Sequence, residues 1–234
     1  MGDGAGRRRA LLALPQGGLA LIRALLLACA LGAAPAIAQH GEQPHHQRFD
    51  DAAKWSRVFD DPAREEWQKP ADVIRALKLH PDAAIADIGS GTGYFAVRLA
   101  RAVPQGRVYG ADLEPDMVRF LNERAAKEGL PNLRSVLAAE DRPNLPGPVD
   151  LVLLVDTYHH VARRAAYFES LRKQLKPGGR VAIIDFTLES PTGPPVRHRI
   201  APQKVAEEMA KAGYRLAEEH RFLPNQYFLV FAPR

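Results

Sequence analysis

This chain has almost no cysteine and no strong excess of one charge. Its 234 residues include a single cysteine, Cys29, so no disulfide can form within it. That absence fits either a reducing or an oxidising compartment. The net charge is +5, but four of the chain's 32 basic residues and one of its 27 acidic residues lie in residues 1–38, so the remainder is nearly neutral at +2. Nucleic acid is therefore disfavoured as a partner, because binding it needs a basic face. The short basic segment Arg197-His198-Arg199 reads as a solvated loop.

Several catalytic signatures are also missing. There is no G-x-S-x-G, as a serine hydrolase elbow would need, and no Tyr-x-x-x-Lys of the kind short-chain dehydrogenases carry. No lysine follows Gly93, as a P-loop would require. His40, His45 and His46 lack the cysteines or regularly spaced carboxylates of a metal site. We predict no metal centre, and a polar, flexible link over residues 39–48.

A long hydrophobic run is absent too. The charge-free run from Ala24 to Ala38 has 15 residues, whereas a spanning helix needs roughly 20. Arg7-Arg8-Arg9 precedes it and Ala36-Ile37-Ala38 closes it, which is typical of a secretory signal peptide. We predict that residues 1–38 are removed, and that the mature domain is exported to the periplasm or secreted without stable membrane insertion. The alternatives are a lipid anchor at Cys29, an organelle transit peptide, or a cytoplasmic protein whose start is misassigned.

The most informative segment that is present is a glycine-rich loop. Asp87-Ile88-Gly89-Ser90-Gly91-Thr92-Gly93 follows an apolar run and precedes a helix-competent stretch. A strand, glycine turn and helix present backbone N–H groups to a ligand, and alternate glycines permit positive φ and close approach. A dinucleotide fingerprint, G-x-G-x-x-G, would place glycine where Tyr94 stands. The carboxylate of Asp87 is unfavourable beside a pyrophosphate and suits a cationic ligand.

Strands and helices alternate from residue 83 onward. Strands are predicted at 83–88, 107–112, 133–138, 149–155, 179–186, 215–222 and 226–232, and helices at 93–102, 115–128, 162–175 and 202–212. This alternation predicts an α/β fold: a Rossmann-like, mainly parallel seven-stranded sheet with helices on both faces. Only Leu223-Pro224-Asn225 separate the last two strands, so these form a C-terminal antiparallel hairpin.

The segment before this sheet is predicted to be helical. One helix runs from Phe49 to Asp60, a second starts at Asp61-Pro62, and a third covers Pro70 to Leu79. We divide the chain into a signal peptide (1–38), a flexible link with an N-terminal helical cap (39–70) and the main domain (71–234).

The glycine loop resembles motif I of the class I S-adenosyl-L-methionine (SAM) dependent methyltransferases. Lys176-Pro177-Gly178-Gly179-Arg180 resembles the same family's L-K-P-G-G landmark, which we interpret as a turn into the fifth strand. The resemblance covers residues 70–234 and implies SAM as the cofactor. SAM carries an ammonium and a sulfonium, in keeping with Asp87.

The resemblance implies a set of cofactor-binding residues. The loop supplies Asp87, Gly89, Ser90, Gly91 and Gly93. Asp112 ends the second strand, where a carboxylate can accept hydrogen bonds from ribose hydroxyls, although it could instead cap the next helix. Leu113 and Met117 follow near the adenine, with Met117 equally suited to the core. Glu140 or Asp141, of which we favour Glu140, meets the adenine amino group, and Asp156 lies near the methionine end.

The catalytic candidates are His159, His160 and Asp156, which follow the fourth strand. A histidine there could take a proton from an acceptor, or it could simply pack under the next helix. The predicted reaction is in-line displacement of the sulfonium methyl by a small-molecule acceptor, whose covers would include Phe49, Trp55, Phe59, Trp67 and the segment from Pro191 to Pro202. A non-enzymatic exported SAM-fold binding protein and an NAD(P)-dependent oxidoreductase are the alternatives, and the oligomeric state stays open.

Overall fold

The computed structural model of the protein describes residue 49 and residues 51–234. The predicted signal peptide, Cys29, and the histidines His40, His45 and His46 lie outside the described residues.

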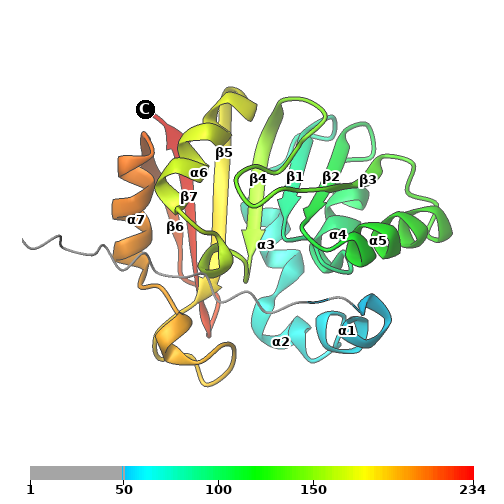
Figure 1. The fold of residues 1–234 in the computed structure, drawn as a ribbon, viewed down its shortest axis with the longest axis horizontal. Coiled ribbons are helices and arrows are strands. Elements are labelled where there is room, and N and C mark those ends of the chain that lie inside the picture. Colours follow the sequence, from blue (N-terminus) through cyan, green and yellow to red (C-terminus); the bar gives the residue numbers. More distant parts are fainter. Residues whose placement is uncertain (1–48, 50) are drawn as a thin grey trace, which may run out of the picture. The chain divides into compact units, whose positions relative to one another are not determined.

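The described part of the chain is built on a seven-stranded sheet in the order β3-β2-β1-β4-β5-β7-β6 (Figure 1). Its strands are β1 (Ala84–Ile88), β2 (Arg107–Asp112), β3 (Leu133–Leu137), β4 (Val149–Val155), β5 (Leu175–Phe186), β6 (Tyr214–His220) and β7 (Gln226–Pro233). Strands β1 to β5 pair in parallel, whereas β7 is antiparallel to both β5 and β6. The predicted parallel sheet with a C-terminal antiparallel hairpin is confirmed.

Helices cover both faces of the sheet and enclose two apolar clusters. The helices are α1 (Ala52–Phe59), α2 (Arg64–Gln68), α3 (Pro70–Ala76), α4 (Tyr94–Ala102), α5 (Pro115–Lys127), α6 (Arg164–Leu171) and α7 (Pro202–Lys211). Helices α3, α4 and α5 contribute buried residues to the first cluster, and α6 and α7 contribute to the second. Because β1, β4 and β5 are covered on both sides, their inner positions are almost uniformly apolar and buried.

The fifth strand and the helix before it differ from the prediction. The predicted helix over 162–175 is shorter: α6 ends at Leu171 and a 3₁₀ turn, Arg172–Gln174, follows. Strand β5 then begins at Leu175, four residues earlier than predicted, so the Pro-Gly-Gly segment lies within it. Leu175 pairs with Val149 and the register then shifts, because the extra residues form an irregularity that Gly178 accommodates at φ 79.

The N-terminal helices differ at their boundaries. The predicted helix from Phe49 to Asp60 is α1, which begins at Ala52 after the N-cap Asp51. Pro62 lies in a turn, and α2 begins at Arg64. Lys69 adopts a left-handed conformation (φ 43) that separates α2 from α3. Among the described residues, no helix is long and apolar enough to cross a membrane.

Strand order indicates where a ligand should bind. After β1 the chain builds outward through β2 and β3 on one side, then returns to place β4 and β5 on the other. Open α/β sheets bind ligands beyond the carboxyl ends of the strands at such a switch point. The segments that follow β1 and β4 are the glycine loop and the run from Asp156 to His160.

Candidate cofactor and acceptor site

The glycine loop has the backbone that its sequence predicts. Gly89, Gly91 and Gly93 adopt φ values of 72°, 52° and 95°. The N–H of Gly89 donates to the carbonyl of Ala111 on β2 at 2.7 Å. A Cβ at Gly89 would lie 2.4 Å from the Thr157 hydroxyl, so this turn requires glycine both for its conformation and for the close approach of the segment after β4.

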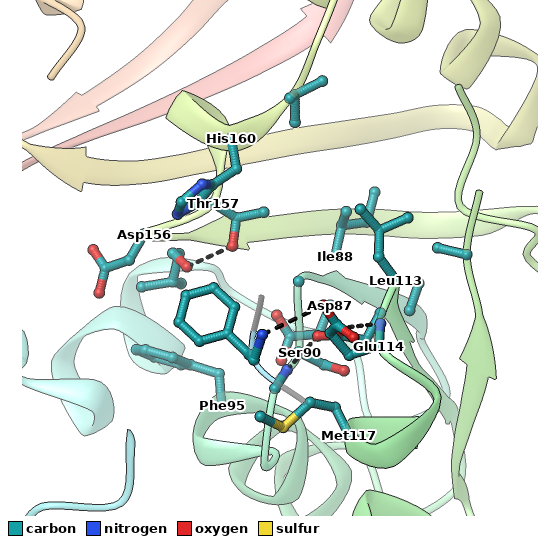
Figure 2. A pocket seen from close by; sticks show the side chains of 18 of the residues that line it. Asp87, Ile88, Ser90, Phe95, Leu113, Glu114, Met117, Asp156, Thr157 and His160 are labelled. Atoms are coloured by element: carbon teal, nitrogen blue, oxygen red, sulfur yellow. Dashed lines mark hydrogen bonds between the residues drawn. The ribbon is translucent and has the colours of Figure 1, made fainter. Parts of the chain in front are cut away.

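The loop forms one wall of a cavity of about 260 Å³ (Figure 2). The carboxyl ends of β1, β2 and β4, the segment after β3, and residues before and within α1 and α2 form the other walls. Besides the loop, residues lining it include Phe49, Phe59, Arg64, Leu113, Glu114, Met117, Glu140, Asp156, Thr157, His160 and Tyr167. The cavity therefore lies at the switch point between β1 and β4.

Two buried hydroxyl groups suit this cavity to a polar ligand. Ser90 and Thr92 both line it, and Thr92 is fully buried. Within the described part of the chain, neither side-chain oxygen has a hydrogen-bond partner. Buried polar groups are normally paired, so a ligand with donors and acceptors fits this wall better than an apolar one.

Two acidic side chains at the strand ends set the charge of the cavity. Asp87 is 3% exposed, and burial together with the nearby Asp112 raises its pKa to about 7. Asp112 is half-buried at the end of β2; its carboxylate accepts hydrogen bonds from the N–H groups of Gly91 (2.8 Å) and Glu114 (3.0 Å). Burial raises the pKa of Asp112 above its ordinary value. Two desolvated acids favour a ligand with a positive charge and hydroxyl donors.

Comparison with known proteins decides between the candidate ligands. Residues 85–179 match the family described as "Methyltransferase domain". The chain is 29% identical over 168 residues to the ubiquinone/menaquinone biosynthesis C-methyltransferase UbiE of Cupriavidus pinatubonensis, covering 67% of this chain and 68% of that protein. It matches the crystal structure of a SAM dependent methyltransferase from Aquifex aeolicus with a TM-score of 0.71 and 27% identity, covering 77% of this chain and 97% of that one. These similarities support a class I SAM-dependent methyltransferase.

Another relative is named for a different substrate. The 27-O-demethylrifamycin SV methyltransferase of Amycolatopsis mediterranei is 31% identical over 157 residues, which is 65% of this chain and 55% of that protein. The relatives and the fold together support SAM-dependent methylation of a small molecule. They do not favour the non-enzymatic binding protein or the NAD(P)-dependent oxidoreductase as alternatives.

Not all of the residues predicted to lie near the adenine line the cavity. Leu113, Met117 and Glu140 line the cavity, and Met117 is also buried against the sheet. Asp141 does not line it: its carboxylate pairs with the Arg142 guanidinium at 3.0 Å on the exposed side of the segment. Of the two acids weighed for the adenine amino group, Glu140 is the one at the cavity.

Glu140 and Asp141 provide a matched pair of variants. We expect Glu140→Gln to weaken SAM binding by about 3- to 10-fold, because an amide accepts a weaker hydrogen bond from the adenine amino group than a carboxylate does. Asp141→Asn should leave the dissociation constant unchanged. Calorimetric titration with SAM checks both, and equal effects of the two substitutions would contradict this assignment.

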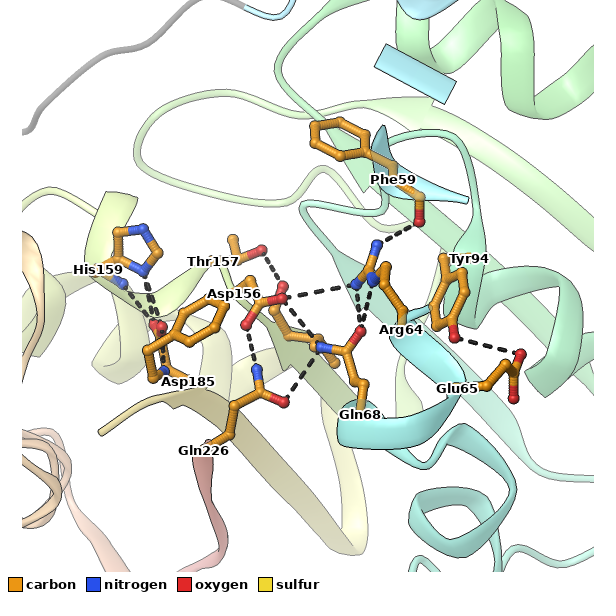
Figure 3. Close-up of polar contacts among 12 residues, drawn as sticks. Phe59, Arg64, Glu65, Gln68, Tyr94, Asp156, Thr157, His159, Asp185 and Gln226 are labelled. Carbon is orange, nitrogen blue, oxygen red and sulfur yellow. Dashed lines mark hydrogen bonds and ion pairs between the residues drawn. The ribbon is translucent and has the colours of Figure 1, made fainter. Parts of the chain in front are cut away.

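Asp156 is held in a strained position directly after β4. Its φ is 54°, unusual for a residue other than glycine. The side-chain amide of Gln68 donates to one carboxylate oxygen at 3.0 Å, and the amide of Gln226 donates to the other (Figure 3). Burial, opposed by Arg64, raises the pKa of Asp156 to about 6. Asp156 thus lines the cavity while linking α2 to the β7 strand.

The two adjacent histidines have different surroundings. His160 lines the cavity, with its ring edge-on to Phe49 at a centroid distance of 6.2 Å. His159 does not line it: its side chain is 5% exposed, and its Nδ1 lies 2.9 Å from a carboxylate oxygen of Asp185 on β5. The structure therefore brings His160, and not His159, to the cavity.

Several residues at the cavity were not predicted from the sequence. Arg64 comes from α2, Glu114 and Thr157 flank predicted residues, and Tyr167 comes from α6. The charged and polar positions of α2 have the pattern of a solvent-exposed helix, so no signal marked Arg64. Glu114 directly follows Asp112 and Leu113 in the sequence, so its position next to two predicted site residues could have identified it.

Only some of the residues predicted to cover the acceptor site line the cavity. Phe49 and Phe59 line the cavity, and Trp55 stacks on Phe59 at 5.5 Å. Trp67 lies against Phe186 instead. None of the lining residues comes from the Pro191–Pro202 segment, so its predicted role as a cover is not supported by its position. The residues described by the structure contain no cluster of His, Cys, Asp and Glu suited to a metal ion.

Proposed function

We propose that this methyltransferase transfers the methyl group of SAM to a small, largely apolar aromatic acceptor that carries an ionisable hydroxyl. The observation that carries this proposal is the makeup of one cavity, whose lining combines the acids Asp87 and Asp112 with aromatic rings and His160. SAM supplies an electrophilic methyl on a positively charged sulfur, and its leaving group is neutral. The protein's task is mainly alignment, together with removal of the acceptor's proton.

The acids that line the cavity suit the cofactor. Asp112 has lone pairs beyond those that accept from Gly91 and Glu114, and ribose hydroxyls are suitable donors to them. Asp87 lies at the end of β1 beside the loop and suits an ammonium group. Leu113 and Met117 offer apolar surface to the adenine, with Glu140 at its edge.

The aromatic residues of the same lining suit a flat, uncharged acceptor. Phe49 lies 4.8 Å from Trp55 and 5.5 Å from Phe59 between ring centroids, so the three rings form one aromatic cluster beside His160. Aromatic pockets with few polar groups bind small apolar ligands. A relative named for ubiquinone/menaquinone biosynthesis supports an aromatic acceptor for this chain too.

Turnover against an acceptor panel tests this proposal. Purified protein is incubated with SAM and phenols, catechols, hydroquinols, aliphatic amines or thiols, and S-adenosylhomocysteine formation is followed. We expect turnover with hydroxylated aromatic compounds and little with aliphatic amines. Preference for amines would overturn the acceptor class, and absence of SAM binding would overturn the function itself.

His160 is the proposed general base. With an acceptor from the panel, His160→Asn should lower kcat by about 10²- to 10⁴-fold, because positioned proton transfer contributes that much, while SAM affinity stays unchanged. Stopped assays at saturating SAM measure this, and calorimetry checks binding. His159→Asn is the control: it disrupts the buried pair with Asp185 and should lower the melting temperature more than the acceptor-dependent rate. If His160→Asn keeps full kcat, the base lies elsewhere.

We also propose that the chain is exported after cleavage behind Ala38. The basic start, the charge-free run and the Ala-x-Ala ending support this, and all of them lie outside the described residues. N-terminal sequencing of the protein from its native host should read from Gln39. A retained Met1 in a cytoplasmic fraction would overturn the proposal.

A further inference from the structure

A largely buried ion pair anchors the turn that carries His160. The turn is a single 3₁₀ turn, Tyr158–His160, directly after β4. The side chain of His159 contacts Asp185 on β5 (Figure 3), and Tyr158 is fully buried in the second apolar cluster. Of the three residues in the turn, only His160 lines the cavity.

The ion pair connects the first residue of the turn to two helices. The Tyr158 hydroxyl donates to the carboxylate of Glu208 on α7 at 2.8 Å. Arg164, the first residue of α6, donates to the same carboxylate from Nε (2.7 Å) and Nη2 (3.2 Å). The Arg164 and Glu208 side chains are 14% and 13% exposed, so their charge-assisted hydrogen bonds are largely shielded from water. Burial and the nearby Glu208 raise the pKa of Tyr158, which keeps its hydroxyl a donor at neutral pH.

The same arginine also contacts the residue after the turn. Its Nη1 donates to the backbone carbonyl of Val161 at 3.3 Å, and Val161 directly follows His160. The pair therefore holds the chain on both sides of His160. It brings together segments that are distant in sequence, since Glu208 is 50 residues from Tyr158 and α6 lies beside α7 (Figure 1).

We propose that Glu208 is a positioning residue: together with Arg164 it holds the turn so that the His160 imidazole stays within proton-transfer distance of the acceptor hydroxyl. This inference rests on the proposed function of His160 as the general base. A base must lie within about 2.6–3.2 Å of the group that it deprotonates. A displacement of about 1 Å can lower a rate by about 10²-fold. Glu208, which does not line the cavity, thereby influences the reaction through Tyr158.

Tyr158→Phe tests the inference by removing one oxygen atom. The variant keeps the ring that stacks on Phe168 at 5.4 Å and leaves the ion pair in place. With an acceptor from the panel, kcat should fall by about 10- to 100-fold, and the dissociation constant of SAM should change by less than about 2-fold. Glu208→Gln replaces one acceptor oxygen with an NH₂ group that faces donors, and should lower kcat by a comparable factor.

Tyr214→Phe is the matched control. The Tyr214 hydroxyl is buried in the same apolar cluster and donates to the backbone carbonyl of Phe168 at 3.0 Å. The two substitutions therefore remove the same atom from similarly buried tyrosines. Both should lower the melting temperature, but Tyr214→Phe should keep kcat within about 2-fold of the wild type.

A double variant shows whether the effect passes through His160. In a His160→Asn background, adding Tyr158→Phe should change the remaining rate by less than about 2-fold, because no base is left to be displaced. A merely structural contribution of Tyr158 would lower the rate by the same factor in both backgrounds.

The outcomes separate this inference from the proposed function. Wild-type kcat in both Tyr158→Phe and Glu208→Gln overturns the inference. So does an equal loss of kcat in Tyr214→Phe, or an equal factor with and without His160. Full kcat in His160→Asn alone overturns the proposed base itself.

Discussion

Replacing Asp112 with asparagine is expected to weaken SAM binding by about 100-fold or more. The carboxylate accepts hydrogen bonds from two backbone N–H groups, one on each oxygen, those of Gly91 and Glu114. An asparagine has one oxygen, so its NH₂ group must face one of those donors. The substitution therefore loses the charge-assisted bonds proposed for the ribose and also disturbs the loop, and each charged hydrogen bond contributes about 1.5–3 kcal/mol. Calorimetric titration with SAM measures the loss.

Asp116 provides the control for this substitution. It lies four residues later, at the start of α5, and its carboxylate accepts from the N–H of Ala52 and pairs with Arg119. It does not line the cavity. Asp116→Asn should keep SAM affinity within about 2-fold, although it loosens the contact between α1 and α5. Wild-type affinity in Asp112→Asn, with the fold intact by circular dichroism, would remove Asp112 from the cofactor site.

Much of the fold could be predicted because its signals are local. Apolar runs such as Val149–Val155 mark strands buried on both faces, and alternate glycines at 89, 91 and 93 mark a turn whose φ values other residues rarely adopt. The carboxyl end of a parallel strand is also a local feature, so Asp87, Asp112 and Asp156 could be placed at one edge of the sheet. The shared cavity confirms that placement.

What the sequence could not predict depends on long-range packing. Nothing local distinguishes His159 from His160, because the position of Asp185 on a neighbouring strand decides which of them is buried. The early start of β5 depends on a partner at Val149, 26 residues away. Arg64 reaches the cavity because Lys69 separates α2 from α3 and directs α2 toward Asp156. Each is a contact between segments, which periodicity along the chain does not report.

Asp87 makes the stability of the cofactor-free protein depend on pH. Its pKa is about 7 in the fold, against 3.8 in the unfolded chain. Between these values the folded state binds more protons than the unfolded state, so the free energy of unfolding falls as pH rises from about 4 to 7 and levels off above. The shift corresponds to a few kcal/mol, on the order of 1.4 kcal/mol per pH unit. Asp156, whose pKa is about 6, adds to the fall in the same direction.

Asp87→Asn is therefore expected to stabilise the cofactor-free protein at pH 8 while abolishing SAM binding. The amide has the size of the carboxyl group but no charge to desolvate, so the gain should be a few kcal/mol at pH 8 and only about 1 kcal/mol at pH 4.5. The lost charge removes the proposed partner of the cofactor's ammonium. Urea unfolding of wild type and variant at the two pH values measures the first effect, and calorimetry the second. A variant less stable than the wild type at pH 8 would contradict the desolvation argument.

SAM binding should consequently release a proton near neutral pH. An ammonium beside Asp87 favours its charged form, so the proton held by the cofactor-free protein at pH 6.5 leaves when the cofactor binds. Affinity should rise by up to about 10-fold between pH 6 and 7 and become constant above 8, as expected for release of one proton. Calorimetry in buffers of different ionisation enthalpy counts that proton directly. The control is Asp156→Asn, which should still release the proton at pH 7, because the pKa of Asp156 is about one unit below that of Asp87. Binding without proton release in the wild type would show that Asp87 does not face the cofactor's charge.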